Sequence, residues 1–179
     1  LHNGMSGEEV AKSMLGYYGL SSVSVVSVPG KLTDHYNPLN KTVNLSPEVF
    51  QGRSVASAAI AAHECGHAVQ HSTSYFWLGM RSKMVPVVNA SSRIMQFVFI
   101  ASIFGMYSLS MGGNTILLVL IGTQAVIASF AVITLPVEYD ASRRALVWLK
   151  GAGITNPQNH SMAEDALKWA ARTYLVAAV

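Results

Sequence analysis

The chain has 179 residues, of which 51% are hydrophobic and only 12% are charged. This length excludes two large domains, and a charged share about half that of an average soluble protein is typical of a membrane protein. Twelve Lys and Arg against nine Asp and Glu leave a net charge of +3, too small a basic excess to indicate a nucleic-acid partner.

Two kinds of local pattern fill the first fifty residues. Ser6, with Glu9 three residues later, is a capping box and predicts a short amphipathic helix over residues 6–18. The β-branched run 23–28 predicts a strand, and residues 42–45 predict a second strand after a turn. We expect an extended peptide to add to the edge of strand 42–45. Together these patterns predict a small β element beside a helix.

A longer helix is predicted over residues 54–71, after a helical turn that begins at Pro47. The segment is rich in alanine and lacks proline, and nearly every side chain before His63 is small or apolar. We therefore expect this helix to be buried on most sides. Its single cysteine, Cys65, is interpreted as a packing residue, and the adjacent Gly66 as a point of close approach to a neighbouring element.

The same helix carries the pattern HExxH as His63, Glu64 and His67. Residues four positions apart lie about 40° apart around a helix and roughly 6 Å apart along it, so both imidazoles can bind the same zinc ion. Glu64 lies about 100° round the axis, where it can accept a proton from a water molecule acidified by the cation. The alternative, two helix histidines without a metal, is unfavourable because an apolar helix leaves them uncompensated.

Two uncharged runs, 94–111 and 115–136, are separated only by Gly-Gly-Asn. As helices they are about 27 and 33 Å long, which matches a hydrocarbon core of about 30 Å. We interpret them as a transmembrane hairpin rather than a buried hairpin of a soluble protein. Basic residues flank both outer ends whereas the connection is uncharged, so the positive-inside rule places both ends in the cytoplasm. The flanking basic residues are Arg81, Lys83, Arg93, Arg143, Arg144 and Lys150.

A catalytic zinc site needs a third protein ligand and an open fourth position. Glu138 is the first carboxylate after the second uncharged run, and a hairpin returns it to the membrane face from which the chain entered. Two histidines and this glutamate would form a site of the gluzincin type. The alternative for Glu138 is an exposed ion pair with Arg143 or Arg144.

Three histidines are weaker candidates for the third ligand. His71 continues the face of the HExxH helix but lies about 6 Å beyond His67, so it reaches the ion only if the helix ends early. His35 and His160 lie in segments that we expect to be loops. Thr73 stands where the longer metzincin pattern requires a histidine, which excludes that class.

Three separated segments, GKLTDHYNP, AAHECGHAVQH and TLPVEYDASRRAL, resemble in the same order the YugP-type neutral zinc metallopeptidases of bacterial membranes. The likeness covers residues 3–174. It implies an integral membrane zinc peptidase with His63 and His67 as metal ligands and Glu64 as general base and acid. It also implies an N-terminal membrane helix that this chain does not include.

A more distant similarity is to the HtpX and CAAX prenyl proteases. In these proteins a glutamate ligand is followed four residues later by an aspartate that supports a zinc-binding histidine. Glu138 matches the first position, but Ser142 occupies the second. A hydroxyl can still donate or accept one hydrogen bond, but it has no charge with which to raise the basicity of the imidazole.

These observations predict a mainly helical, α+β membrane protein that forms one integrated domain. Residues 1–93 are expected to form a cytoplasmic part with the β element and the HExxH helix, residues 94–136 the transmembrane hairpin, and residues 137–179 the helices that include Glu138. We expect an integral protein of the bacterial plasma membrane whose Zn²⁺ site faces the cytoplasm. Its expected partners are the lipid bilayer and a peptide or membrane-protein substrate, which it hydrolyses as a metalloendopeptidase.

Two other functions fit the same residues. In a site-2-type intramembrane protease the HExxH motif lies inside a membrane-spanning helix, but here Arg53 and the polar residues after His67 flank the motif closely. A membrane scaffold or assembly factor could instead keep a structural zinc ion without hydrolysing a substrate. Peptide-cleavage assays with and without a chelator address the difference between enzyme and scaffold.

Overall fold

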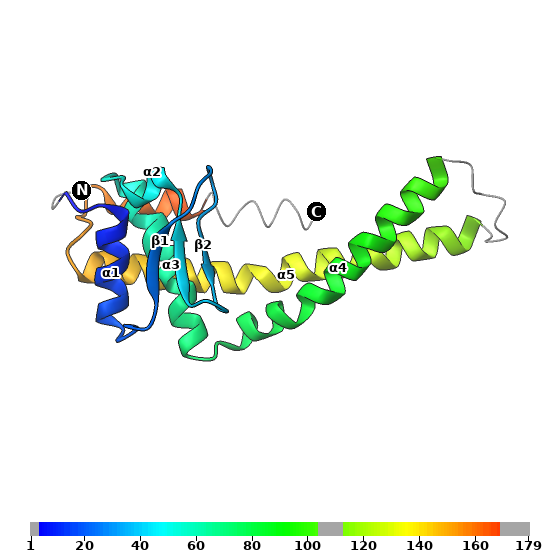
Figure 1. Cartoon of the computed structure of the whole chain (residues 1–179), viewed down its shortest axis with the longest axis horizontal. Helices are drawn as coiled ribbons and strands as arrows, with labels where there is room; N and C mark the ends of the chain where they lie inside the picture. Colours follow the sequence, from blue (N-terminus) through cyan, green and yellow to red (C-terminus); the bar gives the residue numbers. More distant parts are fainter. Residues whose placement is uncertain (1–3, 104–112, 169–179) are drawn as a thin grey trace. The chain divides into compact units, whose positions relative to one another are not determined.

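The computed structural model describes residues 4–103 and 113–168 (Figure 1). Its elements in chain order are α1 (Gly7–Tyr17), β1 (Ser24–Ser27), β2 (His35–Asn37), β3 (Thr42–Leu45), α2 (Pro47–Phe50), α3 (Val55–Ser72), α4 (Phe76–Ile103) and α5 (Gly113–Gly151). Residues 160–168 are also helical. The short helix, the strands β1 and β3, the helical turn and the HExxH helix are therefore confirmed.

The chain divides into two compact units. Of the described residues, the first unit contains 4–75 and 136–168, and the second contains 76–103 and 113–135. Helix α5 contributes residues to both units. The first unit is therefore built from two separate stretches of sequence.

Helices α1 and α3 lie beside the sheet in the first unit (Figure 1). Ser6 begins α1 with the predicted capping box: its Oγ accepts a hydrogen bond from the N–H of Glu9 at 3.3 Å, and Glu9 accepts one from the N–H of Ser6 at 2.7 Å. The buried face of α1 packs with the sheet and the alanines of α3 into one apolar core. This face carries Val10, Met14 and Leu15.

The three strands form one sheet in the order β1-β3-β2, in which β1 is parallel and β2 antiparallel to β3. The predicted turn is present after β2, where Oδ1 of Asn37 accepts hydrogen bonds from the N–H groups of Leu39 and Asn40 at 3.0 and 3.3 Å. The expectation that strand 42–45 offers a free edge to a peptide is wrong. This strand is central, and its backbone groups already pair with β1 and β2.

Helix α3 is buried along most of its length, as the sequence predicts. At the start of this helix, Oγ of Ser54 accepts a hydrogen bond from the N–H of Ser57 at 3.0 Å and so caps the helix. A Cβ atom on Gly66 would lie 2.6 Å from the carbonyl oxygen of Ala141 in α5. Because every other residue would place an atom in this space, Gly66 allows the backbones of α3 and α5 to lie in close contact here.

Helix α5 continues through Pro136, so the predicted helix end at this residue is wrong. An internal proline removes a backbone hydrogen bond, but tertiary packing of the following turns compensates for the loss. Those turns carry a buried apolar stripe at helical spacing, made of Val137, Ala141, Ala145 and Leu149. Glu138 therefore lies within a helix and not at its end.

Helix α4 begins at Phe76, well before the uncharged run starts at residue 94, and includes the charged residues that precede this run. Residues 104–111 of that run and Gly112 of the predicted connection lie outside the described residues. Gly113 and Asn114, also assigned to the connection, already belong to α5.

Among the described residues, two segments are long and apolar enough to cross a membrane: Phe76–Ala101, with 26 residues, and Ile116–Gly151, with 36 residues. Large apolar side chains project from both, and Phe97 is 71% and Leu118 is 69% exposed. Such extensive apolar surface is unfavourable in water and favourable in hydrocarbon. The prediction of an α+β membrane protein is confirmed.

We predict that Gly66→Ala lowers the free energy of unfolding by about 1–3 kcal/mol, because the new methyl group overpacks the contact between α3 and α5. The matched control is Gly16→Ala in α1, where no atom lies within 4 Å of the added Cβ position. The control substitution should raise stability by about 0.5–1 kcal/mol through helix propensity. Urea unfolding in detergent, followed by circular dichroism, measures both, and equal effects would contradict the close-contact argument.

Candidate metal centre

Helix α3 presents two buried histidines, His63 and His67, on one face. Their Nε2 atoms lie 3.2 Å apart, and their ring centroids lie 4.7 Å apart with the ring planes at 82°. The rings therefore converge at one point through their Nε2 atoms, as the spacing of four residues on a helix predicts.

The third side chain of the cluster, Glu138, comes from α5. Its Oε2 lies 3.2 Å from Nε2 of His63 and 3.6 Å from Nε2 of His67. The contact between Gly66 and Ala141 brings this turn of α5 against α3. The structure thus brings together the three residues that the sequence analysis selected.

The cluster of His63, His67 and Glu138 fits a small divalent cation. Its ligand atoms are separated by 3.2, 3.2 and 3.6 Å. Donors held about 2.1 Å from a tetrahedral ion lie about 3.4 Å from one another, so these atoms suit zinc with little rearrangement. Two imidazole nitrogens and one carboxylate oxygen are also a donor set that catalytic zinc sites use, with one position left open.

The electrostatic environment of His67 suits a cation. Burial alone lowers the pKa of His67, but its hydrogen bond with Glu138 and the negative charges of Glu64 and Glu138 outweigh burial and raise this pKa above its ordinary value. The same position therefore attracts a proton or a metal ion, and the two compete for Nε2.

Both imidazoles are also held at the nitrogen that faces away from the cluster. Nδ1 of His63 lies 3.1 Å from Oγ of Ser142, and Nδ1 of His67 lies 3.0 Å from Oε1 of Gln70. Ser142 thus forms a hydrogen bond with the ring of His63, as the sequence analysis allows for a hydroxyl in place of aspartate at this position. Such contacts orient a ring so that Nε2 remains available as a ligand.

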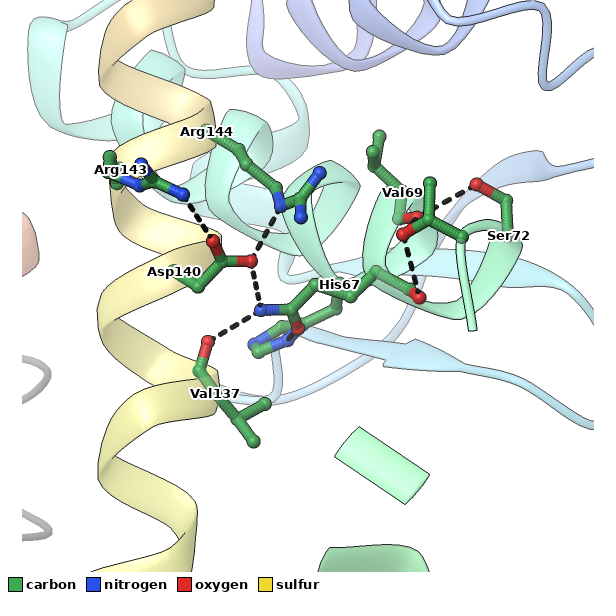
Figure 2. Close-up of polar contacts among 9 residues, drawn as sticks. His67, Val69, Ser72, Val137, Asp140, Arg143 and Arg144 are labelled. Carbon is green, nitrogen blue, oxygen red and sulfur yellow. Dashed lines mark hydrogen bonds and ion pairs between the residues drawn. The ribbon is translucent and has the colours of Figure 1, made fainter. Parts of the chain in front are cut away.

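Asp140 is held between two arginines of α5 (Figure 2). Its Oδ1 accepts a hydrogen bond from Nη2 of Arg143 at 2.8 Å, and its Oδ2 accepts one from Nε of Arg144 at 2.6 Å. The alternative in which Glu138 pairs with one of these arginines is therefore wrong. Spacings of three and four residues place Asp140, and not Glu138, beside both guanidinium groups.

The other histidines make different contacts, and none belongs to the cluster found among the described residues. Nδ1 of His71 lies 2.9 Å from a tyrosine hydroxyl of β2, and Nδ1 of His35 lies 2.7 Å from a backbone oxygen. Nδ1 of His160 lies 2.9 Å from a threonine hydroxyl. The hydroxyl of Thr73 donates to the carbonyl oxygen of Val69 at the end of α3.

Glu64 lies between His63 and His67 in the sequence of α3, and its side chain is buried. Within residues 4–103 and 113–168, no hydrogen bond or ion pair occupies its carboxylate. Its oxygens therefore remain available to accept a proton. Cys65, on another face of the helix, is buried and donates to the carbonyl oxygen of Ala11 at 3.6 Å, in keeping with a packing role.

Sequence reasoning missed two residues, Gln70 and Asp140. Gln70 follows His67 by three residues on α3, a spacing at which helical side chains meet, and its polarity in a buried helix is the signal that could have identified it. Asp140 gave no comparable signal, because an acid next to two arginines in a helix usually forms exposed ion pairs.

The fold and the site together define a class: an α+β membrane protein with a buried cluster of two histidines and one glutamate that fits zinc. The chain belongs to the family described as "Putative neutral zinc metallopeptidase", whose model matches residues 1–179. It is 39% identical over 177 residues to "Putative membrane protease YugP" of Bacillus subtilis (strain 168), an alignment that covers 99% of this chain and 76% of the relative. No solved structure matches the chain significantly. The family resemblance noted in the sequence is confirmed.

We predict opposite pH trends for the metal-free and the zinc-supplemented protein. The pKa of His67 is raised in the folded state, so protonation of His67 stabilises the metal-free protein. This stabilisation is complete below the ordinary pKa of 6.5 and is lost as the pH rises through the raised pKa of the folded state. Zinc needs the neutral imidazole, so the zinc-induced rise in Tm should grow as pH increases over the same range. Thermal unfolding with chelator or zinc, from about pH 6 to 8, measures both trends. A zinc effect that does not change with pH would contradict this account.

Proposed function

We propose that this protein is a membrane-bound zinc metalloendopeptidase of the gluzincin type, in which His63, His67 and Glu138 hold the ion and Glu64 is the general base. The observation that carries the proposal is the convergence of three buried ligand atoms, from two helices, at separations of 3.2 to 3.6 Å. Membership of a zinc metallopeptidase family supports the same reaction class.

The chemistry of the proposed reaction divides between the ion and the chain. When bound, zinc acidifies a water molecule and polarises a peptide carbonyl. Glu64 accepts the proton of the attacking water and returns it to the departing amine, which its unoccupied carboxylate allows. Ser142 and Gln70 hold the two rings so that their Nε2 atoms stay directed at the ion.

The packing of α3 favours a site at the membrane boundary over a site-2-type arrangement. Helix α3 contacts α1, α2 and the strands of the first unit. It is not among the described helices that are long and apolar enough to cross a membrane. A HExxH helix enclosed by protein in this way supports hydrolysis of peptides outside the hydrocarbon core.

We place the proposed enzyme in the bacterial plasma membrane with its site on the cytoplasmic side. The name of the relative, a membrane protease, and the two apolar segments support the membrane location. The orientation follows from the basic residues at the outer ends of both apolar runs. Its substrates are accordingly peptides or membrane proteins with an accessible cytoplasmic segment.

We predict that Glu64→Gln abolishes hydrolysis but leaves zinc bound. The amide has nearly the same shape but cannot accept the proton, and loss of a general base typically costs about 10²- to 10⁴-fold in rate. Casein and peptide cleavage with purified protein, together with metal analysis, measure the two properties. Full turnover by this variant would refute the role of Glu64, and a zinc-loaded wild type without activity on any peptide would favour the scaffold.

We predict that Glu138→Ala lowers zinc affinity by more than about 100-fold. Loss of a hydrogen bond that supports a ligand typically costs about 10- to 100-fold in affinity, and this substitution removes a ligand itself. The matched control is Glu48→Ala, which removes an exposed carboxylate in α2 and should leave zinc affinity unchanged. Zinc affinity is measured by competition with a chromogenic chelator. Equal zinc stoichiometry in wild type and Glu138→Ala would transfer the third ligand to another residue.

A further inference from the structure

Gln70 is completely buried, with 0% of its surface exposed, and all the polar atoms of its side chain have partners. Its Nε2 donates to the carbonyl oxygen of Val137 at 2.8 Å and to Oδ2 of Asp140 at 2.9 Å. Its Oε1 lies 3.0 Å from Nδ1 of His67. A single side chain on α3 therefore joins a candidate metal ligand to two groups on α5.

These contacts allow only one orientation of the Gln70 amide. A carbonyl oxygen and a carboxylate oxygen can only accept hydrogen bonds, so the NH₂ group must face Val137 and Asp140. The amide oxygen must then face His67, which leaves Nδ1 of the ring as the donor. An imidazole with its proton on Nδ1 keeps the lone pair of Nε2 free, and Nε2 is the atom directed at the cluster.

Asp140 is itself held in a fixed position. Its Oδ1 accepts a hydrogen bond from Arg143 and its Oδ2 one from Arg144, so both oxygens already act as acceptors (Figure 2). The guanidinium carbon of Arg144 also lies 5.8 Å from the centre of the Tyr75 ring. A hydroxyl such as that of Ser142 can donate or accept, so His63 lacks an equivalent constraint.

We propose that Gln70 is a positioning residue that imposes the Nδ1-protonated tautomer on His67, and that Asp140 determines the direction of the Gln70 amide. In this arrangement the carboxylate of Asp140 does not contact the ring of His67 directly. It acts on the ring through the amide of Gln70, which hydrogen-bonds to both. This inference rests on the proposed function because it takes His67 as a metal ligand.

The first test measures zinc affinity by chelator competition in Gln70→Met, a substitution of similar length without hydrogen-bonding groups. We expect affinity to fall about 10- to 100-fold, the usual loss when a partner of a metal-bound histidine is removed. The matched control is Gln51→Met at an exposed position, which should leave affinity unchanged. The absorption spectrum of the Co²⁺-substituted full-length protein reports whether the geometry at the ion has changed. Circular dichroism confirms that each variant is folded.

The second test exchanges the amide and the carboxylate. Gln70→Glu places two carboxylates together, and Asp140→Asn removes the group that sets the amide direction, so each single variant should weaken zinc binding. The double variant Gln70→Glu/Asp140→Asn restores an acceptor towards His67 and a donor between the two positions. We expect it to bind zinc more tightly than Gln70→Glu and to recover the wild-type Co²⁺ spectrum, a non-additive result.

Two results overturn the inference while leaving the proposed function intact. One is a wild type that binds zinc and a folded Gln70→Met that binds it equally well with the same Co²⁺ spectrum. The other is strictly additive losses in the double variant, which would indicate a purely structural role. A wild-type protein that binds no zinc would instead overturn the proposed metal centre, and this inference with it.

Discussion

The close contact between Gly66 of α3 and Ala141 of α5 is the constraint on which the rest of the candidate centre depends. Helix α3 supplies the two histidines, and α5 supplies Glu138 and Ser142 from positions on either side of the contact. Both helix backbones must approach until their atoms touch, because a carboxylate side chain is short. A residue with no Cβ at position 66 permits this approach without displacing the adjacent histidine.

Burial of several ionisable groups in one place is costly unless each group has a partner. The first unit meets this requirement on the outer side of each ring through Ser142 and Gln70. Asp140 in turn is neutralised by two arginines. The inner side, where the two Nε2 atoms and Glu138 meet, is where the proposed cation would supply the remaining compensation.

The rules of helix capping and helix geometry predicted the features that involve residues close together in the sequence. The capping box at Ser6 and the convergence of His63 and His67 follow from helix geometry alone, and both are present. Contacts between distant segments were harder to predict. The link from Gln70 to Asp140 crosses from α3 to α5, and the order of strands places β3 in the centre of the sheet, neither of which periodicity reveals. The helix was predicted to end with the uncharged run at residue 136, but α5 continues because the turns beyond Pro136 carry a buried apolar stripe.

The division of the first unit into two stretches of sequence has a consequence for biosynthesis. Residues 1–75 leave the ribosome with both histidines, but Glu138 follows only after the intervening segment Phe76–Leu135 has been translated. Since synthesis proceeds from the N-terminus, the cluster cannot form until the segment that holds both apolar runs has been translated. The candidate metal centre is thus completed only late in synthesis, after the intervening segment has been made.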